Sequence, residues 1–159
     1  MAQWNGNRPL IVLTFELEGE VFALEATHVR EILDPGPVTE VPNSAPHVGG
    51  LINVRGKVVP LADIRLKFGM SQRPATIDTR FVVIEAMVDG DPVIVAILAD
   101  KVHEIAEMAA ASLEETPRIG MRWRPDYITC VGKRGPDFII VLDIGRILSA
   151  DSQPRLTAA

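Results

Sequence analysis

A short pattern of residues occurs twice in this chain, and the repetition constrains the fold more than any other feature. The run Val-Arg-Glu-Ile at 29–32 returns as Val-His-Glu-Ile at 102–105. An Arg-Gly pair followed by Asp-Ile occurs within 55–64 and again within 134–144. Such short matches of common residues can arise by chance, but their shared order favours two related lobes.

Most apolar segments have the composition of β-strands, because they are short, rich in β-branched residues and bounded by Gly, Pro or Asp. Apolar and polar residues alternate over 13–18, which predicts a half-buried strand. The Asp-Gly dipeptide at 89–90 predicts a tight hairpin between strands at 81–86 and 93–98. The two Arg-Gly turns are expected to join two more strand pairs.

Signals for helices are few. Apolar residues over 26–33 have helical spacing, which predicts a helix that ends at the Pro-Gly-Pro run 35–37. A second short helix is predicted from Asp143 to Leu148. The polar stretch 70–78 could be a linker between two halves. The sequence therefore predicts an all-β fold with one or two short helices.

The repeats predict how the chain is divided. We expect one domain over 10–149, made of two β-lobes of approximately 10–70 and 79–149 that could exchange strands. Residues 1–9 and 152–159 are expected to be flexible tails. Lobes of this size, with roughly five short strands each, favour small closed barrels, because closure removes exposed sheet edges.

Composition excludes several classes of function. The formal net charge is -5, which disfavours non-specific binding to nucleic acids or to anionic membranes. Cys130 is the only cysteine, so no intrachain disulfide can form, and its strand-like surroundings predict a buried structural thiol. No basic-then-apolar stretch opens the chain, and no apolar run approaches the roughly 20 residues that span a bilayer. We expect a soluble, cytoplasmic protein.

A search for catalytic or metal-binding motifs yields little. His28, His47 and His103 are far apart in the sequence and lack metal-binding spacing. Phosphate-binding loops, dinucleotide turns and nucleophile elbows are missing. Asp63 and Asp143 could form an acid–base pair, but each precedes an apolar residue at the start of a predicted helical turn. A capping role there, which stabilises by about 1 kcal/mol, is the favoured interpretation.

The Arg-Gly pair at Arg55 and Gly56 is the strongest candidate for a binding site. It lies between two strands, so Arg55 could simply be a solvated turn residue, or it could be a guanidinium held rigidly for recognition. Val29 and Ile32 could belong to the core. If one of them is exposed, an apolar patch rimmed by Arg55 and Glu31 would form a partner site.

An ordered series of motifs over Phe15–Phe68 identifies a family. It contains an acidic-glycine hairpin, Val-x-Glu-Ile, Val-Pro-Asn, Pro-x-x-Val-x-Gly-Leu-Ile-Asn-Val-Arg-Gly-Lys-Val-Val-Pro, Asp-Ile-Arg and Phe-Gly. In these motifs the segment closely resembles the CheW family of chemotaxis coupling proteins. Looser matches at 102–105, 127–128 and 142–144 extend the resemblance to roughly 10–149.

This resemblance implies two SH3-like five-stranded barrels packed side by side. It also implies a non-catalytic adaptor without a cofactor, which links the cytoplasmic hairpin tip of methyl-accepting chemoreceptors to the regulatory domain of a CheA-type histidine kinase. In the family, a groove between the barrels takes the receptor helix. Carried over to this chain, Arg55 is the first candidate for receptor binding, with Val29, Glu31, Gly50 and Asn53 as companions.

Two regions depart from the family pattern. Cys130 stands where the family commonly has glycine, which puts the local turn in question. The segment 114–120 matches no pattern, and the family uses this neighbourhood to contact the kinase or neighbouring modules. Glu114, Arg118 and Ile119 are therefore candidates for kinase or array contacts.

Other functions remain as alternatives. The chain could serve a non-flagellar chemosensory array that controls pili or development. A fragment of the kinase is less expected, because 159 residues leave no room for a phosphotransfer or ATP-binding domain. Small barrels also bind nucleic acids, but only 5% of residues are aromatic and the charge is acidic. An enzyme built from scattered Asp and His residues is the remaining class.

Overall fold

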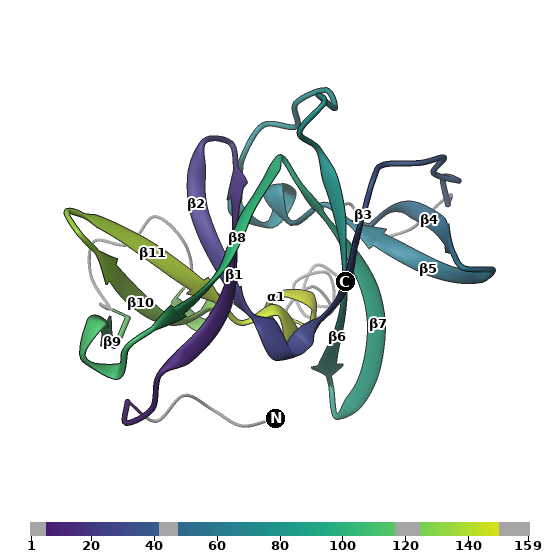
Figure 1. Cartoon of the computed structure of the whole chain (residues 1–159). Coiled ribbons are helices and arrows are strands. Elements are labelled where there is room, and N and C mark those ends of the chain that lie inside the picture. The colour runs from purple at the N-terminus through teal and green to yellow at the C-terminus, as the bar shows by residue number, and fades with distance from the viewer. Residues whose placement is uncertain (1–5, 42–47, 117–124, 150–159) are drawn as a thin grey trace, which may run out of the picture.

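The computed structural model describes residues 6–41, 48–116 and 125–149, which form eleven strands and a few short helices (Figure 1). The strands are β1 Leu10–Leu17, β2 Glu20–Glu25, β3 Val29–Leu33, β4 Val48–Val54, β5 Lys57–Ala62, β6 Arg80–Val88, β7 Asp91–Ala99, β8 Lys101–Met108, β9 Leu113–Glu114, β10 Ile128–Arg134 and β11 Asp137–Leu142. The 3₁₀ helices are η1 Ala26–His28, η2 Ile64–Phe68, η3 Ala110–Ser112 and η4 Pro125–Tyr127, and the α-helix is α1 Ile144–Ser149. Of the predicted tails 1–9 and 152–159, residues 1–5 and 152–159 lie outside the described residues.

The strands form two sheets that lie side by side (Figure 1). We call the sheet β8-β1-β2-β11-β10-β9 lobe A and the sheet β3-β6-β7-β5-β4 lobe B. The predicted all-β class with two curved lobes and a minor helical part is confirmed. Each lobe takes strands from both 10–70 and 79–149, because β1 and β2 belong to lobe A whereas β6 and β7 belong to lobe B.

The two lobes share one topology, which confirms the repeat found in the sequence. The order β8-β1-β2-β11-β10 in lobe A corresponds to β3-β6-β7-β5-β4 in lobe B. Each lobe has one parallel pair, β11 with β2 and β5 with β7. The predicted turn at Asp89-Gly90 joins β6 to β7, and both Arg-Gly turns join antiparallel strands.

The prediction of a helix over 26–33 is wrong. Only η1 is helical, and the rest is strand β3, which pairs with β6. A β-bulge at Arg30 explains the misleading spacing, since Val29 lies opposite Ile84 and Ile32 lies opposite Val82. The inserted residue puts two apolar side chains three positions apart on the same face, which imitates a helical period.

The short helix predicted after Asp143 is confirmed as α1, and both aspartates cap the turns that follow them. Asp63 Oδ1 accepts a hydrogen bond from the Arg65 backbone N–H at 3.1 Å. Asp143 Oδ1 accepts one from the Arg146 backbone N–H, also at 3.1 Å. These contacts confirm the capping role and use the aspartate oxygens as structural acceptors.

The described residues form three hydrophobic cores. Each lobe has its own, including Val12 and Val141 in lobe A and Val54 and Phe81 in lobe B. The largest cluster lies between the sheets, where the ring of Phe68 in η2 stacks on a lobe A phenylalanine ring with centroids 5.6 Å apart. The lobes therefore share a packed apolar interface. Within the described ranges, no helix is long and apolar enough to cross a membrane.

Candidate partner-binding site

The turn between β4 and β5 is a two-residue hairpin loop made of Arg55 and Gly56. Their φ angles are 53° and 85°, as a type I′ turn requires, although a side chain at positive φ is uncommon. The Asn53 side-chain oxygen accepts a hydrogen bond from the Gly56 backbone N–H at 2.7 Å. The turn is therefore held from within, and it projects the Arg55 side chain, which is 80% exposed.

Arg55 forms a bidentate ion pair with Glu31 of β3. Its Nε lies 3.2 Å from Oε2, and its Nη2 lies 3.1 Å from Oε1. The hydrogen bond to Glu31, and then the charge of that carboxylate, raise the pKa of Arg55 above its usual value. Strands β3 and β4 are opposite ends of the lobe B sheet, so this pair bridges the opening of the barrel.

Val29 lies on the other face of β3 from Glu31. The bulge at Arg30 puts Val29 opposite Ile84 of the inter-lobe core and Glu31 opposite Val83 of the lobe B core. Val29 is partly buried and packs on the inter-lobe core. The structure thus brings Arg55, Glu31 and Asn53 together and places Val29 at the seam between the lobes.

Gly50 is buried, and its contribution is to backbone packing. Its φ is 145°, and a Cβ there would lie 2.4 Å from the Thr39 carbonyl oxygen. The backbones of Thr39 and Leu51 exchange hydrogen bonds of 2.9 and 2.8 Å. Gly50 therefore allows the segment after β3 to lie against β4, which narrows the gap between the two edge strands.

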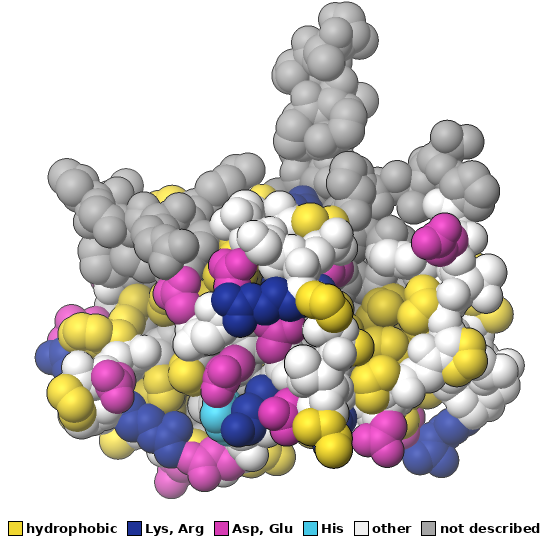
Figure 2. Space-filling view, turned by 90° about the horizontal axis from the view of Figure 1, so that it is seen from above, with side chains coloured by type: hydrophobic (Ala, Val, Ile, Leu, Met, Phe, Trp, Pro, Cys, Tyr) yellow, Lys and Arg dark blue, Asp and Glu magenta, His cyan; other side chains and the backbone are white. Residues whose placement is uncertain are grey.

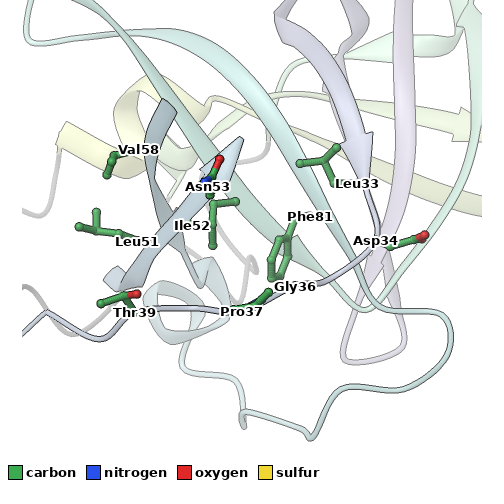
Figure 3. A pocket seen from close by; sticks show the side chains of 10 residues that line it. All are labelled: Leu33, Asp34, Gly36, Pro37, Thr39, Leu51, Ile52, Asn53, Val58 and Phe81. Atoms are coloured by element: carbon green, nitrogen blue, oxygen red, sulfur yellow. The ribbon is translucent and has the colours of Figure 1, made fainter. Parts of the chain in front are cut away.

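A cavity of about 350 Å³ opens next to the turn, and it is lined mainly by apolar side chains (Figure 3). Its lining comes from the end of β3, the segment that follows, the β4–β5 hairpin and β6: Leu33, Asp34, Gly36, Pro37, Thr39, Leu51, Ile52, Asn53, Val58 and Phe81. Val58 is 71% exposed and Ile32 is 41% exposed. Val58 and the cavity thus form an exposed apolar patch beside the turn, whereas Ile32 lies with Val29 on the other face of β3 from Glu31.

Lobe A carries a related arrangement. Arg134, at the end of β10, pairs with Glu104 of β8, which occupies the repeat position of Glu31. Phe138 follows the turn as Val58 does in lobe B, and it is 61% exposed. A smaller cavity of about 280 Å³ lies beside this pair, but Lys133 and Arg134 line it, so its chemistry is more polar.

The candidate kinase contacts lie partly outside the described residues. Glu114 is exposed in β9 and forms an ion pair with Lys133, whereas Arg118 and Ile119 fall in the segment that is not described. Cys130 is buried as predicted, and burial, followed by the charge of Glu25, raises its pKa to about 12. A β-bulge accompanies Cys130, just as one accompanies Gly50 in β4.

The histidines make separate contacts. His28 Nδ1 lies 3.2 Å from the Glu85 carbonyl oxygen, and His103 Nε2 lies 2.6 Å from Glu16 Oε2. His47 lies outside the described residues. Where side chains are described, no three metal-ligating groups gather at one place.

Sequence reasoning missed a buried polar network around Arg65. This side chain is 3% exposed and is bound by Asp63 and Asp100, with Gln72 adding a hydrogen bond to Asp63. The Asp-Ile-Arg motif was recognised only as part of a family resemblance. A usable signal was present, since Arg65 follows a capping aspartate at a position where the second repeat has Gly145.

Comparisons with known proteins agree on one family. The sequence model of the CheW-like domain matches residues 12–152. The chain is 29% identical over 139 residues to the chemotaxis protein CheW of Klebsiella aerogenes, covering 87% of this chain and 81% of that protein. It is 34% identical over 115 residues to CheW of Rhizobium meliloti, covering 72% and 70%. The scaffolding protein TtCheW from Thermoanaerobacter tengcongensis has the same fold, with a TM-score of 0.77 at 24% identity and coverage of 87% and 92%.

Proposed function

The chain belongs to the CheW-like domain family, and from this premise we propose that it is a non-catalytic scaffold that couples chemoreceptor tips to a CheA-type histidine kinase. The two sequence relatives are chemotaxis proteins, and the protein of matching fold is a scaffolding protein, which supports an adaptor role in chemotaxis. We propose that residues 10–149 act as one CheW-like domain. The observation that carries the proposal is the Arg55–Glu31 pair beside an apolar cavity at the mouth of lobe B.

We propose that the receptor hairpin tip binds around Arg55. Helix-in-groove recognition needs apolar anchors and a few polar groups that fix orientation. Val58 and the neighbouring cavity offer apolar contact, while the guanidinium of Arg55 offers a planar fork for a carboxylate or carbonyl oxygen. Glu31 and Asn53 hold that fork in place. Val29 and Gly50 would contribute through the packing of β3 and β4.

A scaffold needs a second surface for its second partner. We propose that the kinase regulatory domain or a neighbouring array module binds near Glu114 in lobe A, with Arg118 and Ile119 as further candidates. Strand β9 lies at the opposite end of the molecule from the β4–β5 hairpin (Figure 1). Separate surfaces would allow both partners to bind at once. The proposed location is the cytoplasm, with recruitment to membrane-associated receptor arrays.

The comparisons favour neither of two alternatives. A non-flagellar array that controls pili or development would use the same contacts. A nucleic-acid binder would need a continuous basic groove, whereas acidic and basic side chains are interspersed over the described part of the face in Figure 2. The net charge of -5 also opposes this alternative.

Substitution of Arg55 tests the receptor site. We expect Arg55→Glu to weaken binding of a receptor-tip fragment at least tenfold, because a carboxylate would then repel Glu31 and any acidic contact. The matched control is Arg134→Glu, which reverses the related pair in lobe A and should leave receptor binding within about twofold. Titration calorimetry measures both affinities, and circular dichroism checks the fold.

Different results of these measurements would refute the assignment of Arg55 to the site and the proposed function. If Arg55→Glu binds the receptor fragment as the unmodified protein does, Arg55 does not belong to the site. If the unmodified protein binds neither the receptor fragment nor the kinase regulatory domain, the proposed function is wrong.

A further inference from the structure

The two lobes meet at a pair of junctions that occupy equivalent places in the repeat. After β5, the turn η2 of lobe B and the residues behind it reach the β1–β2 hairpin of lobe A. After β11, helix α1 of lobe A packs against β6 of lobe B, where a Cβ on Gly145 would lie 2.4 Å from the Met87 carbonyl oxygen. The second junction is therefore a close backbone contact, and the first is built differently.

The first junction contains a buried cation, Arg65, beside the ring stack of Phe68. Nε and Nη2 of Arg65 donate hydrogen bonds to the two oxygens of Asp63, at 2.8 and 2.7 Å. Its Nη1 donates to Asp100 Oδ1 at 2.9 Å. Burying a charged group costs free energy unless the group is fully paired. Because Arg65 is paired with both carboxylates, they offset this cost and also fix the orientation of its guanidinium group.

Asp100 carries this contact from lobe B into lobe A. It lies between β7 and β8, where the chain crosses from one sheet to the other. Its Oδ2 accepts a hydrogen bond from the Glu18 backbone N–H at 2.7 Å, and its own backbone N–H donates to the Glu16 carbonyl at 3.0 Å. The Glu18 carboxylate in turn accepts from the Ser71 backbone N–H, just beyond η2, at 3.0 Å.

The repeat shows that a lobe can form without such a cation. In lobe A, Gly145 stands at the position of Arg65, and Asp143 caps the following turn without a buried cation beside it. The nearby Arg146 contacts the same carboxylate from a side chain that is 58% exposed. Because both lobes have the same topology, the buried cation is not a requirement of the lobe fold. Its contacts instead run between the lobes.

We infer that Arg65 and Asp100 are positioning residues that fix the angle between the two lobes. This inference rests on the proposed function, because a scaffold must present its two partner surfaces in a fixed relation. The shared hydrophobic core keeps the lobes together, but apolar contact is non-directional. Hydrogen bonds from one guanidinium to Asp63 in lobe B and to Asp100 at the crossing, which in turn binds Glu18 in lobe A, add the directional restraint.

The direct test is a distance measurement between the lobes. Spin labels are placed at the two hairpin tips, through Lys57→Cys in lobe B and Asp137→Cys in lobe A, while Cys130 stays buried. Pulsed electron resonance then compares the unmodified background with Asp100→Asn and Arg65→Lys. An amide at 100 can accept from only one of its two partners, and lysine cannot bridge both carboxylates with a planar fork.

We expect both variants to broaden or shift the distance distribution. The control Arg146→Ala, which removes the exposed arginine beside Asp143, should leave the distribution unchanged. In unlabelled protein, Asp100→Asn should bind the receptor fragment and the kinase regulatory domain singly within about twofold. We further expect each partner to enhance the binding of the other to the unmodified protein, and this enhancement should fall about fivefold or more in Asp100→Asn.

Two results would overturn the inference. One is an unchanged distance distribution in a folded Asp100→Asn variant, whether or not Arg65→Lys folds. The other is a broadened distribution with undiminished coupling between the partners. Failure of the unmodified protein to bind either partner would refute the proposed function instead, while the distance data would still report on the junction.

Discussion

Arg55 and Gly50 both have positive φ angles in the same hairpin, yet they play different parts. The turn at Arg55 faces open space, because a Cβ added to the neighbouring Gly56 would meet nothing within 4 Å. Gly50 is enclosed, with the Thr39 carbonyl oxygen and the Val38 side chain against it. A side chain is therefore tolerated at 55, where it can serve binding, and is excluded at 50.

This contrast predicts the effect of a single methyl group. Gly50→Ala should destabilise the protein by about 2 kcal/mol, because the Cβ would meet Thr39 at 2.4 Å and the backbone angle is strained for alanine. The neighbouring Gly49→Ala is the matched control, since its nearest contact would be an ordinary 3.7 Å. Urea unfolding measures both, and equal midpoints for the two variants would contradict this account.

At this scale the sequence identified some residues and missed others. The place of Arg55 in a turn between strands was predicted correctly, as were the caps Asp63 and Asp143, whereas the role of Arg55 in binding stays a prediction. The exposure of Val58 and the burial of Arg65 depend on which sheet face each strand presents, and that required the three-dimensional register. Gly50 was named only through a family resemblance, because no local pattern shows that Thr39 approaches it.

At the scale of elements, strands β3 and β8 show why a local pattern can mislead. Val29 and Ile32 in β3, like Val102 and Ile105 in β8, are three residues apart and share a face because a bulge intervenes. From sequence alone, this spacing is indistinguishable from part of a helical period. Whether such a segment forms a helix or a strand is decided by the strand that pairs with it, which is β6 for β3 and β1 for β8. The hairpins were predictable because their turn residues are local signals.

We expect Asp63, which caps η2, to make the free energy of unfolding depend on pH in the acid range. Burial alone would raise the pKa of Asp63, but hydrogen bonds from Arg65 and Gln72, together with the charge of Arg65, outweigh it and lower the pKa. Because the pKa of Asp63 is lower in the folded state, its ionised carboxylate stabilises the protein. This stabilisation is fully present at pH values above the unfolded-state pKa of about 3.9. That stabilisation is lost as the pH falls further, through the folded-state pKa.

Urea midpoints between about pH 6 and pH 2 measure this dependence. The decline below about pH 4 should be steeper in the unmodified protein than in Asp63→Asn, which is already weakened at pH 6 because Arg65 loses its charged partner. If the urea midpoints of the two proteins fall in parallel as the pH decreases, Asp63 is not responsible for the pH dependence of stability.

At the scale of the whole molecule, the fold joins the two halves of the chain by exchanging strands. The sequence predicted two related lobes, and the structure has them, but lobe A is completed by β1 and β2 from the N-terminal half. No local signal reports which sheet a hairpin joins. Long-range packing in the inter-lobe core, which contains Leu13 and Ile84 from different lobes, settles that choice.

Strand exchange predicts that neither half of the chain folds alone. A fragment of residues 1–75 would contain β1 and β2 without β11, and β5 without β7, so both parallel pairs would be missing. We expect weak circular dichroism and no cooperative thermal transition for this fragment or for residues 76–159. Mixing the two should restore strand signal. A sharp unfolding transition in either fragment alone would contradict the exchanged architecture.

The central claim is that this molecule bridges two partners. Sedimentation velocity of a receptor-tip fragment and a CheA-type regulatory domain, with and without this protein, tests that claim most directly. We predict that a species containing all three forms only when the protein is present, and that Arg55→Glu removes the receptor from it while Arg134→Glu does not. Two binary complexes that exclude one another, or no complex at all, would contradict the account.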